Sequence, residues 1–287
     1  MSDVYLNGKF VNSDLAKVSV FDQGFLYGDG IFESFRSVKG KLYQFSKHYQ
    51  RLVQSAEALS YPLAFTQQQL EEILLTLCER NGWKNAYYRI TITRGKGQIG
   101  FQRDMDNDLT CFIVGREFQG LDDEYYQQGI KVKVAQTRRN APEAISPKIK
   151  SISNLNSLLG KLEAKALGTF EVIMLNNKEH ICEGSASNIF WTRDQWVFTP
   201  GASTGLLEGV TRSTIMRLCE EELNLRVISG EFKLQDLQFS DEVFITSTSL
   251  EVIPVVQVDA FTINQGQVGP IAKRLRQELH RDMEKRS

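Results

Sequence analysis

Several kinds of site are disfavoured by what this 287-residue chain lacks. It contains only three histidines and no H-E-x-x-H or similar spacing, so no protein-built metal site is expected. Its four cysteines are widely spaced and form no C-x-x-C pair, a pattern typical of buried, reduced thiols in a cytoplasmic protein. No apolar run approaches the roughly 20 residues that a membrane-spanning helix needs.

The chain also lacks an excess of either positive or negative charge. The formal net charge is −1, with 34 basic and 35 acidic residues interspersed, so a nucleic-acid-binding surface is not expected. The first residues, Met1–Tyr5, lack the basic start and apolar core of a signal peptide. Hydrophobic residues make up 41% of the chain and its length suffices for two modest domains, so we expect an ordinary globular protein.

The order of apolar and turn-forming residues predicts an α+β protein. An Asn7-Gly8 turn joins two short strands, and residues 31–38 and 42–45 form a second hairpin. Thr66 is expected to cap a helix that stops at Asn81-Gly82. Helices are predicted at residues 46–59, 68–80, 154–167, 211–222 and 270–284, and strands at 87–93, 109–114, 130–136, 170–175, 188–192 and 242–246.

A polar stretch near residues 116–129 divides the pattern in two. We therefore predict a small N-terminal α/β domain at residues 1–118, a linker at 119–129 and a larger C-terminal domain at 130–287.

The segment around Lys150 is the most specific indication of the protein's function. Lys150 precedes a helical stretch, Glu183 follows in Cys182–Phe190, and Gly209–Arg212 opens another helix. A lysine, a carboxylate, a glycine-threonine helix start and a late Ser/Thr cluster are the parts needed to hold pyridoxal phosphate. Each residue alone is more often an ordinary surface side chain, so their conjunction carries the inference.

Several motifs give the chain a resemblance to the class IV, fold-type IV pyridoxal phosphate enzymes. These motifs are Phe21–Glu33, Lys150 with Glu163-Ala164 thirteen residues on, Glu183-Gly184-x-x-x-Asn188, Gly209–Arg212 and Gly269-Pro270-Ile271. This family includes the branched-chain aminotransferases, the D-amino acid aminotransferases and the aminodeoxychorismate lyases. The resemblance covers almost the whole chain and implies a two-domain fold whose larger α/β domain has a β-barrel-like core.

The resemblance implies a catalytic role for two residues. Lys150 matches the lysine that forms the Schiff base with pyridoxal 5′-phosphate and then shuttles the substrate's α-proton. Glu183 matches the carboxylate that keeps the pyridine nitrogen protonated, which makes the cofactor an electron sink.

Phosphate binding is implied at three further places. Arg51 matches the phosphate-binding arginine, and the amides of Val210 and Thr211 face the phosphate from a helix N-terminus. Thr248 resembles a second phosphate-binding segment, although a strand end followed by an ST-turn explains this cluster as well.

Substrate residues are implied by position in the branched-chain enzymes. They are Tyr27, Arg36, Tyr87 and Arg89, and Arg94 in a glycine-rich loop is a further candidate for a substrate carboxylate.

The chain departs from the family patterns in two places. The tyrosine that follows the lysine in the branched-chain enzymes is replaced by Asn154 and Leu155. The Arg-x-His carboxylate trap of the D-amino acid enzymes has no counterpart in Gln98–Phe101.

The leading interpretation is an amino-acid aminotransferase, of branched-chain type, which moves an amino group between an amino acid and a 2-oxo acid by a ping-pong Schiff-base mechanism. An aminodeoxychorismate lyase is the alternative, since Arg138–Pro142 and Thr199–Leu207 also resemble those enzymes. A D-amino acid aminotransferase and a non-catalytic phosphate-binding protein are weaker alternatives. The family resemblance implies a homodimer, and an apparent surplus of aromatic residues in the small domain favours an interface. These residues are Phe25, Tyr27, Phe32, Phe35, Tyr43 and Phe45.

Overall fold

The computed structural model describes residues 2–63, 65–100 and 108–286, which form two compact units. The first unit contains Met1–Gln119, the segment Lys148–Ser153 and the chain's end from Arg286. The second contains Gly120–Pro147 and Asn154–Lys285. The segment that carries Lys150 therefore belongs to the first unit, although the sequence pattern predicted it within the C-terminal domain, residues 130–287.

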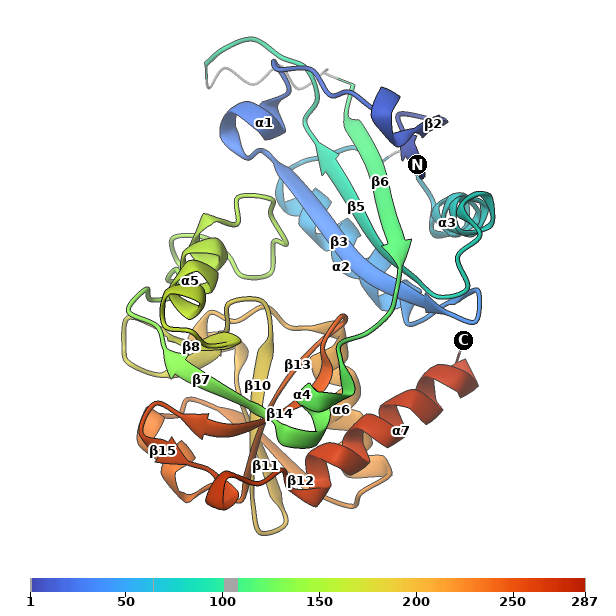
Figure 1. Cartoon of the computed structure of the whole chain (residues 1–287). Coiled ribbons are helices and arrows are strands. Elements are labelled where there is room, and N and C mark those ends of the chain that lie inside the picture. Colours follow the sequence, from blue (N-terminus) through green and yellow to red (C-terminus); the bar gives the residue numbers. More distant parts are fainter. Residues whose placement is uncertain (1, 64, 101–107, 287) are drawn as a thin grey trace. The chain divides into compact units, whose positions relative to one another are not determined.

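The first unit is built on a six-stranded antiparallel sheet with the strand order β2-β1-β6-β5-β3-β4 (Figure 1). The strands are β1 (Asp3–Leu6), β2 (Lys9–Asn12), β3 (Gly30–Val38), β4 (Lys41–Leu42), β5 (Ala86–Thr93) and β6 (Thr110–Glu117). Its helices are α1 (Gln23–Tyr27), α2 (Phe45–Ala58) and α3 (Gln67–Asn81). Helix α2 packs on β3, and α3 packs on β1.

Local sequence rules explain these elements. In β5 every second side chain is buried in the core, namely Ala86, Tyr88, Ile90 and Ile92. Thr66 and Gln69 form the predicted capping box at the start of α3, and Gly82 ends that helix with φ +66°.

The expected surplus of aromatic rings on this unit is not found. Phe32, Phe35, Tyr43 and Phe45 are all buried. Phe35 and Phe45 belong to the hydrophobic core, whereas the Phe32 ring is covered by Arg89 and Lys150. Of the residues that suggested an interface, Phe25 is the clearly exposed one, with 76% of its surface accessible.

The second unit is built on a nine-stranded mixed sheet with the order β12-β11-β10-β13-β14-β7-β8-β9, and β15 pairs with β14. The strands are β7 (Ile130–Val134), β8 (Glu171–Leu175), β9 (Ile181–Gly184), β10 (Asn188–Arg193), β11 (Trp196–Pro200), β12 (Arg226–Gly230), β13 (Glu242–Ser247), β14 (Glu251–Val258) and β15 (Phe261–Thr262). Edge strand β9 also contacts β10 and β11, so the sheet curls back on itself. This is the expected barrel-like core.

Four helices accompany this sheet (Figure 1). They are α4 (Asp123–Gln128), α5 (Leu155–Ala166), α6 (Val210–Glu221) and α7 (Pro270–Arg286). Helix α5 packs on β8, while α6 packs on β12 and β13. Helix α4 lies within the stretch expected to be a linker.

The predicted α+β class is confirmed, and the five predicted helices occur within a few residues of their expected limits. Strands β9, β11, β12, β14 and β15 were not predicted. Among the described residues, no helix is both long and apolar enough to cross a bilayer.

Candidate functional site

Lys150 is fixed through its backbone to β3 and α2. Its carbonyl accepts a hydrogen bond from the Phe32 N–H at 2.9 Å, and its own N–H donates to the Ser55 Oγ at 3.1 Å. The segment continues along β3, since the Ile152 N–H donates to the Gly30 carbonyl at 2.9 Å. The half-buried side chain brings Nζ to 4.4 Å from the centre of the Phe32 ring.

Arg51 is held by a buried carboxylate. Its Nε and Nη2 donate to the two oxygens of Glu33 at 2.6 and 2.9 Å, and the His48 Nδ1 lies 2.8 Å from the same carboxylate. Burial alone would raise the pKa of Glu33, but the charge and hydrogen bonds of Arg51, aided by His48, lower this pKa to about 2. Burial also lowers the pKa of His48, so a neutral imidazole that donates from Nδ1 fits this arrangement.

Three of the predicted substrate residues share one face of the first unit's sheet. Arg36 pairs across the strands with Tyr87, and Ser34 pairs with Arg89. Strand alternation turns these side chains away from the face that carries Ile90 and the core. The Arg89 guanidinium lies 3.7 Å from the centre of the Phe32 ring, the ring that Lys150 also approaches.

The other two candidates have different surroundings. The Tyr27 hydroxyl accepts a hydrogen bond from the Gly100 N–H at 2.6 Å. The Arg94 guanidinium is buried, donates to Asp29 at 2.7 Å and to the Leu59 carbonyl at 2.8 Å, and stacks on Tyr61. Arg94 is thus engaged in an ion pair within its own unit.

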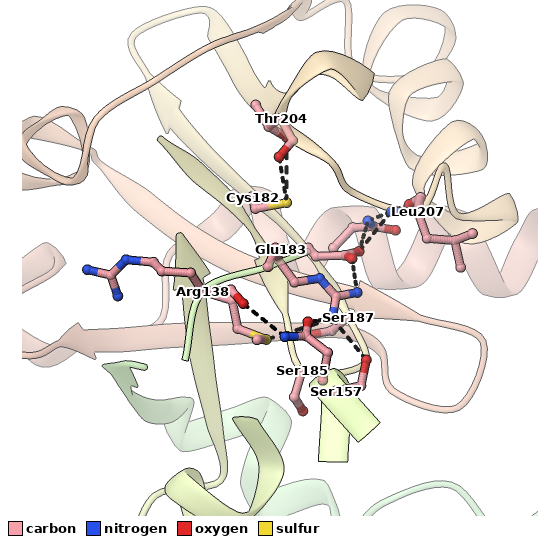
Figure 2. A network of polar contacts seen from close by, with 12 residues as sticks. Arg138, Ser157, Cys182, Glu183, Ser185, Ser187, Thr204 and Leu207 are labelled. Carbon is pink, nitrogen blue, oxygen red and sulfur yellow. Dashed lines mark hydrogen bonds and ion pairs between the residues drawn. The ribbon is translucent and has the colours of Figure 1, made fainter. Parts of the chain in front are cut away.

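Glu183 lies at the centre of the second unit's polar network (Figure 2). Glu183 is a residue of β9, and only 4% of its surface is exposed. Its carboxylate accepts hydrogen bonds from Arg139, from the Asn188 Nδ2 at 3.2 Å and from the Leu207 N–H at 3.2 Å. Burial would lower the pKa of Arg139, but the charge of Glu183 and its hydrogen bond raise this pKa above its ordinary value.

Helix α6 begins at Val210, with Thr211 next, as predicted. The N-cap residue, Gly209, has no side chain that could cap this N-terminus, so the first amides of the helix suit an anion. A Cβ on Gly209 would clash with the Asn188 Oδ1, so glycine is required for this close approach. Arg212 anchors the first turn by donating to the Pro200 carbonyl at 2.8 Å and to the Ser229 Oγ at 3.0 Å.

Thr248 lies in the turn between β13 and β14. The Leu250 N–H donates to the Ser247 Oγ at 3.2 Å, as in the ST-turn considered above. Glu251 closes the turn with φ +60° and accepts from Arg276 at 2.9 Å, so the turn is tied to α7.

The predicted cofactor residues are therefore divided between the units. Lys150 and Arg51 belong to the first, whereas Glu183, the α6 N-terminus and Thr248 belong to the second. In the described ranges, His, Cys, Asp and Glu side chains nowhere gather in groups of three that could hold a metal ion.

Four polar residues around these side chains received no role from the sequence. They are Glu33, His48, Arg139 and Asn188. Glu33, Arg139 and Asn188 stand inside motifs that were noted for the family resemblance, and that was the only available signal. Arg139 and Asn188 lie 44 and 5 residues from Glu183 along the chain, and no local sequence pattern links residues 44 positions apart.

A family model described as Amino-transferase class IV matches residues 30–258. The chain belongs to this family. The match spans most of the second unit and β3 to β6 of the first, so it includes Lys150, Arg51 and Glu183. The predicted family membership is confirmed.

Known proteins resemble this class IV aminotransferase over nearly its full length. A protein of Methanocaldococcus jannaschii, provisionally named a branched-chain-amino-acid aminotransferase, is 36% identical over 276 residues, which cover 96% of this chain and 94% of that protein. A D-alanine aminotransferase of Staphylococcus epidermidis is 30% identical over 287 residues, covering all of both chains.

Among solved structures, the branched-chain amino acid aminotransferase of Escherichia coli superposes with a TM-score of 0.93 and 30% identity. The alignment covers 97% of this chain and 93% of that one. The predicted fold-type IV architecture is confirmed by this match.

Proposed function

We propose that this class IV aminotransferase uses pyridoxal 5′-phosphate to move amino groups between branched-chain amino acids and 2-oxo acids. The observation that carries the proposal is the buried carboxylate of Glu183. Donors from its own unit fix this carboxylate in one orientation, and the Arg139 guanidinium beside it favours the ionised form. A buried, oriented anion of this kind suits a protonated pyridine nitrogen.

The donor sets of both units fit the rest of this cofactor. Lys150 supplies the amine for its aldehyde. The uncapped amides of Val210 and Thr211 suit a phosphate, and the hydroxyl and amide of Thr248 offer further donors. Arg51 would contribute its positive charge, with Glu33 fixing the plane of its guanidinium.

When bound, the cofactor would delocalise the electron pair that stays on the substrate's α-carbon after that carbon loses its proton. The remaining chemistry belongs to the chain. Lys150 would take the proton from that carbon and return it elsewhere, so its amine must be held in one position. Phe32 serves this by contacting Nζ with its ring and the lysine carbonyl with its N–H.

We assign substrate recognition to the sheet face that carries Arg36, Tyr87 and Arg89. Guanidinium groups suit the carboxylates of amino acids and 2-oxo acids, and aromatic side chains suit an apolar substrate side chain. Tyr27 and Arg94 are retained as weaker candidates, because Arg94 already pairs with Asp29.

The branched-chain assignment is supported by the 36% identity to the archaeal relative, against 30% for the D-alanine enzyme, and by the superposition on a branched-chain enzyme. The D-alanine relative keeps a D-amino acid aminotransferase as the second candidate. An aminodeoxychorismate lyase is not favoured.

Three parallel assays test the function. The purified protein, loaded with pyridoxal phosphate, is given L-leucine with 2-oxoglutarate, D-alanine with 2-oxoglutarate, or aminodeoxychorismate. We expect glutamate formation in the first assay to exceed product formation in the others by at least about 100-fold in kcat/KM, a contrast of about 3 kcal/mol. Faster release of pyruvate in either of the other assays would replace the branched-chain assignment.

The domain roles and assembly complete the proposal. Residues 130–287 would carry most of the cofactor contacts, and residues 1–118 would contribute Arg51 and the substrate face. A cytoplasmic location fits the four buried, unpaired cysteines. We further propose a homodimer, supported by exposed leucines on one helix. On α5, Leu155, Leu158, Leu159 and Leu162 are 42–64% exposed.

A further inference from the structure

Arg139 forms an ion pair with Glu183 and is nearly as buried as its partner. The exposed fractions of the two side chains are 15% and 5%. Neighbouring Arg138 differs, because its side chain pairs with Glu179 where the two are 36% and 57% exposed. Arg139 thus forms a buried ion pair and Arg138 an exposed one, although the two residues are adjacent in the same loop.

The guanidinium of Arg139 is fixed from several sides. Its Nη1 donates to the Ser157 Oγ at 2.9 Å and to the Asn156 Oδ1 at 3.1 Å, while Nη2 donates to Glu183. The Arg139 backbone N–H donates to the Leu175 carbonyl at 2.9 Å. The first turn of α5 and the end of β8 therefore hold this side chain in one direction.

A buried carboxylate without a counter-charge is strongly unfavourable, and removing one partner of a buried pair leaves that cost uncompensated. Asn188 and the Leu207 amide satisfy hydrogen bonds of Glu183 but carry no charge. Buried Arg212 also interacts electrostatically with Glu183, but its guanidinium donates to the Pro200 carbonyl and the Ser229 Oγ. Arg139 donates to the carboxylate itself, so its guanidinium is the direct counter-charge of Glu183 with or without a bound cofactor.

We propose that Arg139 is a positioning residue that balances the charge of Glu183 in the empty enzyme and shares this carboxylate with the cofactor's ring nitrogen in the loaded enzyme. The proposal rests on the proposed function, in which Glu183 faces that nitrogen. The stability of the empty protein should therefore depend on Arg139 more than the stability of the loaded protein does. Without Arg139, the positive charge of the bound cofactor should stabilise ionised Glu183 more than it does in the wild type.

Melting temperatures of the empty protein and of the protein saturated with pyridoxamine 5′-phosphate test this. That probe has no aldehyde, so it binds reversibly without reacting with a lysine. We expect Arg139→Met to lower the melting temperature of the empty protein by about 6–10 °C, and that of the saturated protein by half as much or less.

Three further variants serve as controls. Arg138→Met removes the neighbouring surface pair, and Ser157→Ala removes one contact of Arg139 with α5 but no charge. Both are expected to shift the empty and saturated proteins equally, by less than about 3 °C. Arg139→Lys keeps the charge, so the empty protein should recover at least half of the loss seen with Met.

A double variant gives a second test in the empty protein alone. Glu183→Gln leaves Arg139 as the uncompensated charge, so adding Arg139→Met to it should raise the melting temperature instead of lowering it. Equal losses in the empty and saturated forms of Arg139→Met, or additive losses in the double variant, would overturn the role given to Arg139. If the wild-type protein fails to bind the probe, the proposed function falls, whereas the double-variant comparison still decides the charge balance.

Discussion

Phe32 contacts Lys150 twice, through its backbone N–H on the lysine carbonyl at 2.9 Å and through its ring at 4.4 Å from Nζ. The six-residue segment Lys148–Ser153 is thereby added to β3 of the first unit, where Ile31 and Ser151 also form an antiparallel bridge. The same ring is covered by Arg89 at 3.7 Å. One aromatic side chain thus connects the proposed catalytic lysine to the proposed substrate face.

Replacement of Lys150 by Ala should abolish transamination while the protein stays folded, because a half-buried lysine contributes little to stability. Exposed Lys148→Ala is the matched control and should keep activity. Mass analysis after borohydride reduction of the loaded protein should find the cofactor on the peptide that contains Lys150. An adduct at Lys148 or Lys161 would refute the assignment.

Glu183→Gln should retain the cofactor but lower kcat by about 100-fold, because a neutral amide no longer favours the protonated ring nitrogen. Steady-state kinetics and the cofactor content of the purified variant check this. A variant with near wild-type kcat would show that another group supports the ring.

Arg51→Ala should weaken retention of the cofactor by about 10–100-fold, the usual effect of losing a charge-assisted hydrogen bond. Dialysis followed by titration with pyridoxal phosphate measures the dissociation constant. Arg51→Lys keeps the charge beside Glu33 and separates the loss of phosphate binding from a loss of stability. If both variants bind pyridoxal phosphate as tightly as the wild type, Arg51 has no part in cofactor binding and only pairs with Glu33.

The Glu33 carboxyl should make stability pH-dependent below pH 4.5. Its pKa is about 2 in the folded protein against an ordinary value of 4.5, so its contribution is complete above pH 4.5 and is lost as the pH falls toward 2. This difference corresponds to about 3 kcal/mol.

Urea unfolding between pH 5 and 3 measures this contribution. Glu33→Gln should flatten the fall in unfolding free energy over that range. Glu179→Gln removes an exposed carboxylate whose pKa is also lowered, by its hydrogen bond to Arg138, and it should flatten the fall less because solvent screens that pair. Equal slopes for the wild type and Glu33→Gln would show that another carboxyl dominates.

Light scattering at micromolar concentration should report twice the mass of the 32.7 kDa chain. Leu158→Glu on the exposed face of α5 should shift the protein toward the monomer if that face is the interface, because a charge cannot be buried there cheaply. The surface change Glu179→Gln is the control. A wild-type monomer with full activity would exclude the proposed dimer.

Much of the local structure was determined by the sequence. The limits of α3 follow from Thr66 and Gly82, and the start of α6 follows from Gly209–Arg212, since caps and turns depend on a few neighbouring residues. The family motifs also predicted roles for Lys150 and Glu183, because a Schiff base needs an amine and a protonated ring nitrogen needs a carboxylate partner.

Tertiary structure decided the partners of these residues. The pairing of Glu183 with Arg139 spans 44 positions, and the contact of Lys150 with Ser55 spans 95. Neither is encoded in a local pattern, because hydrogen bonds between distant segments form only once the sheets bring the strands together. Phe25 and Phe35 are the same residue type, yet Phe25 is exposed and Phe35 is buried. Only the tertiary structure decides this difference, because it determines which side chains the packed core covers.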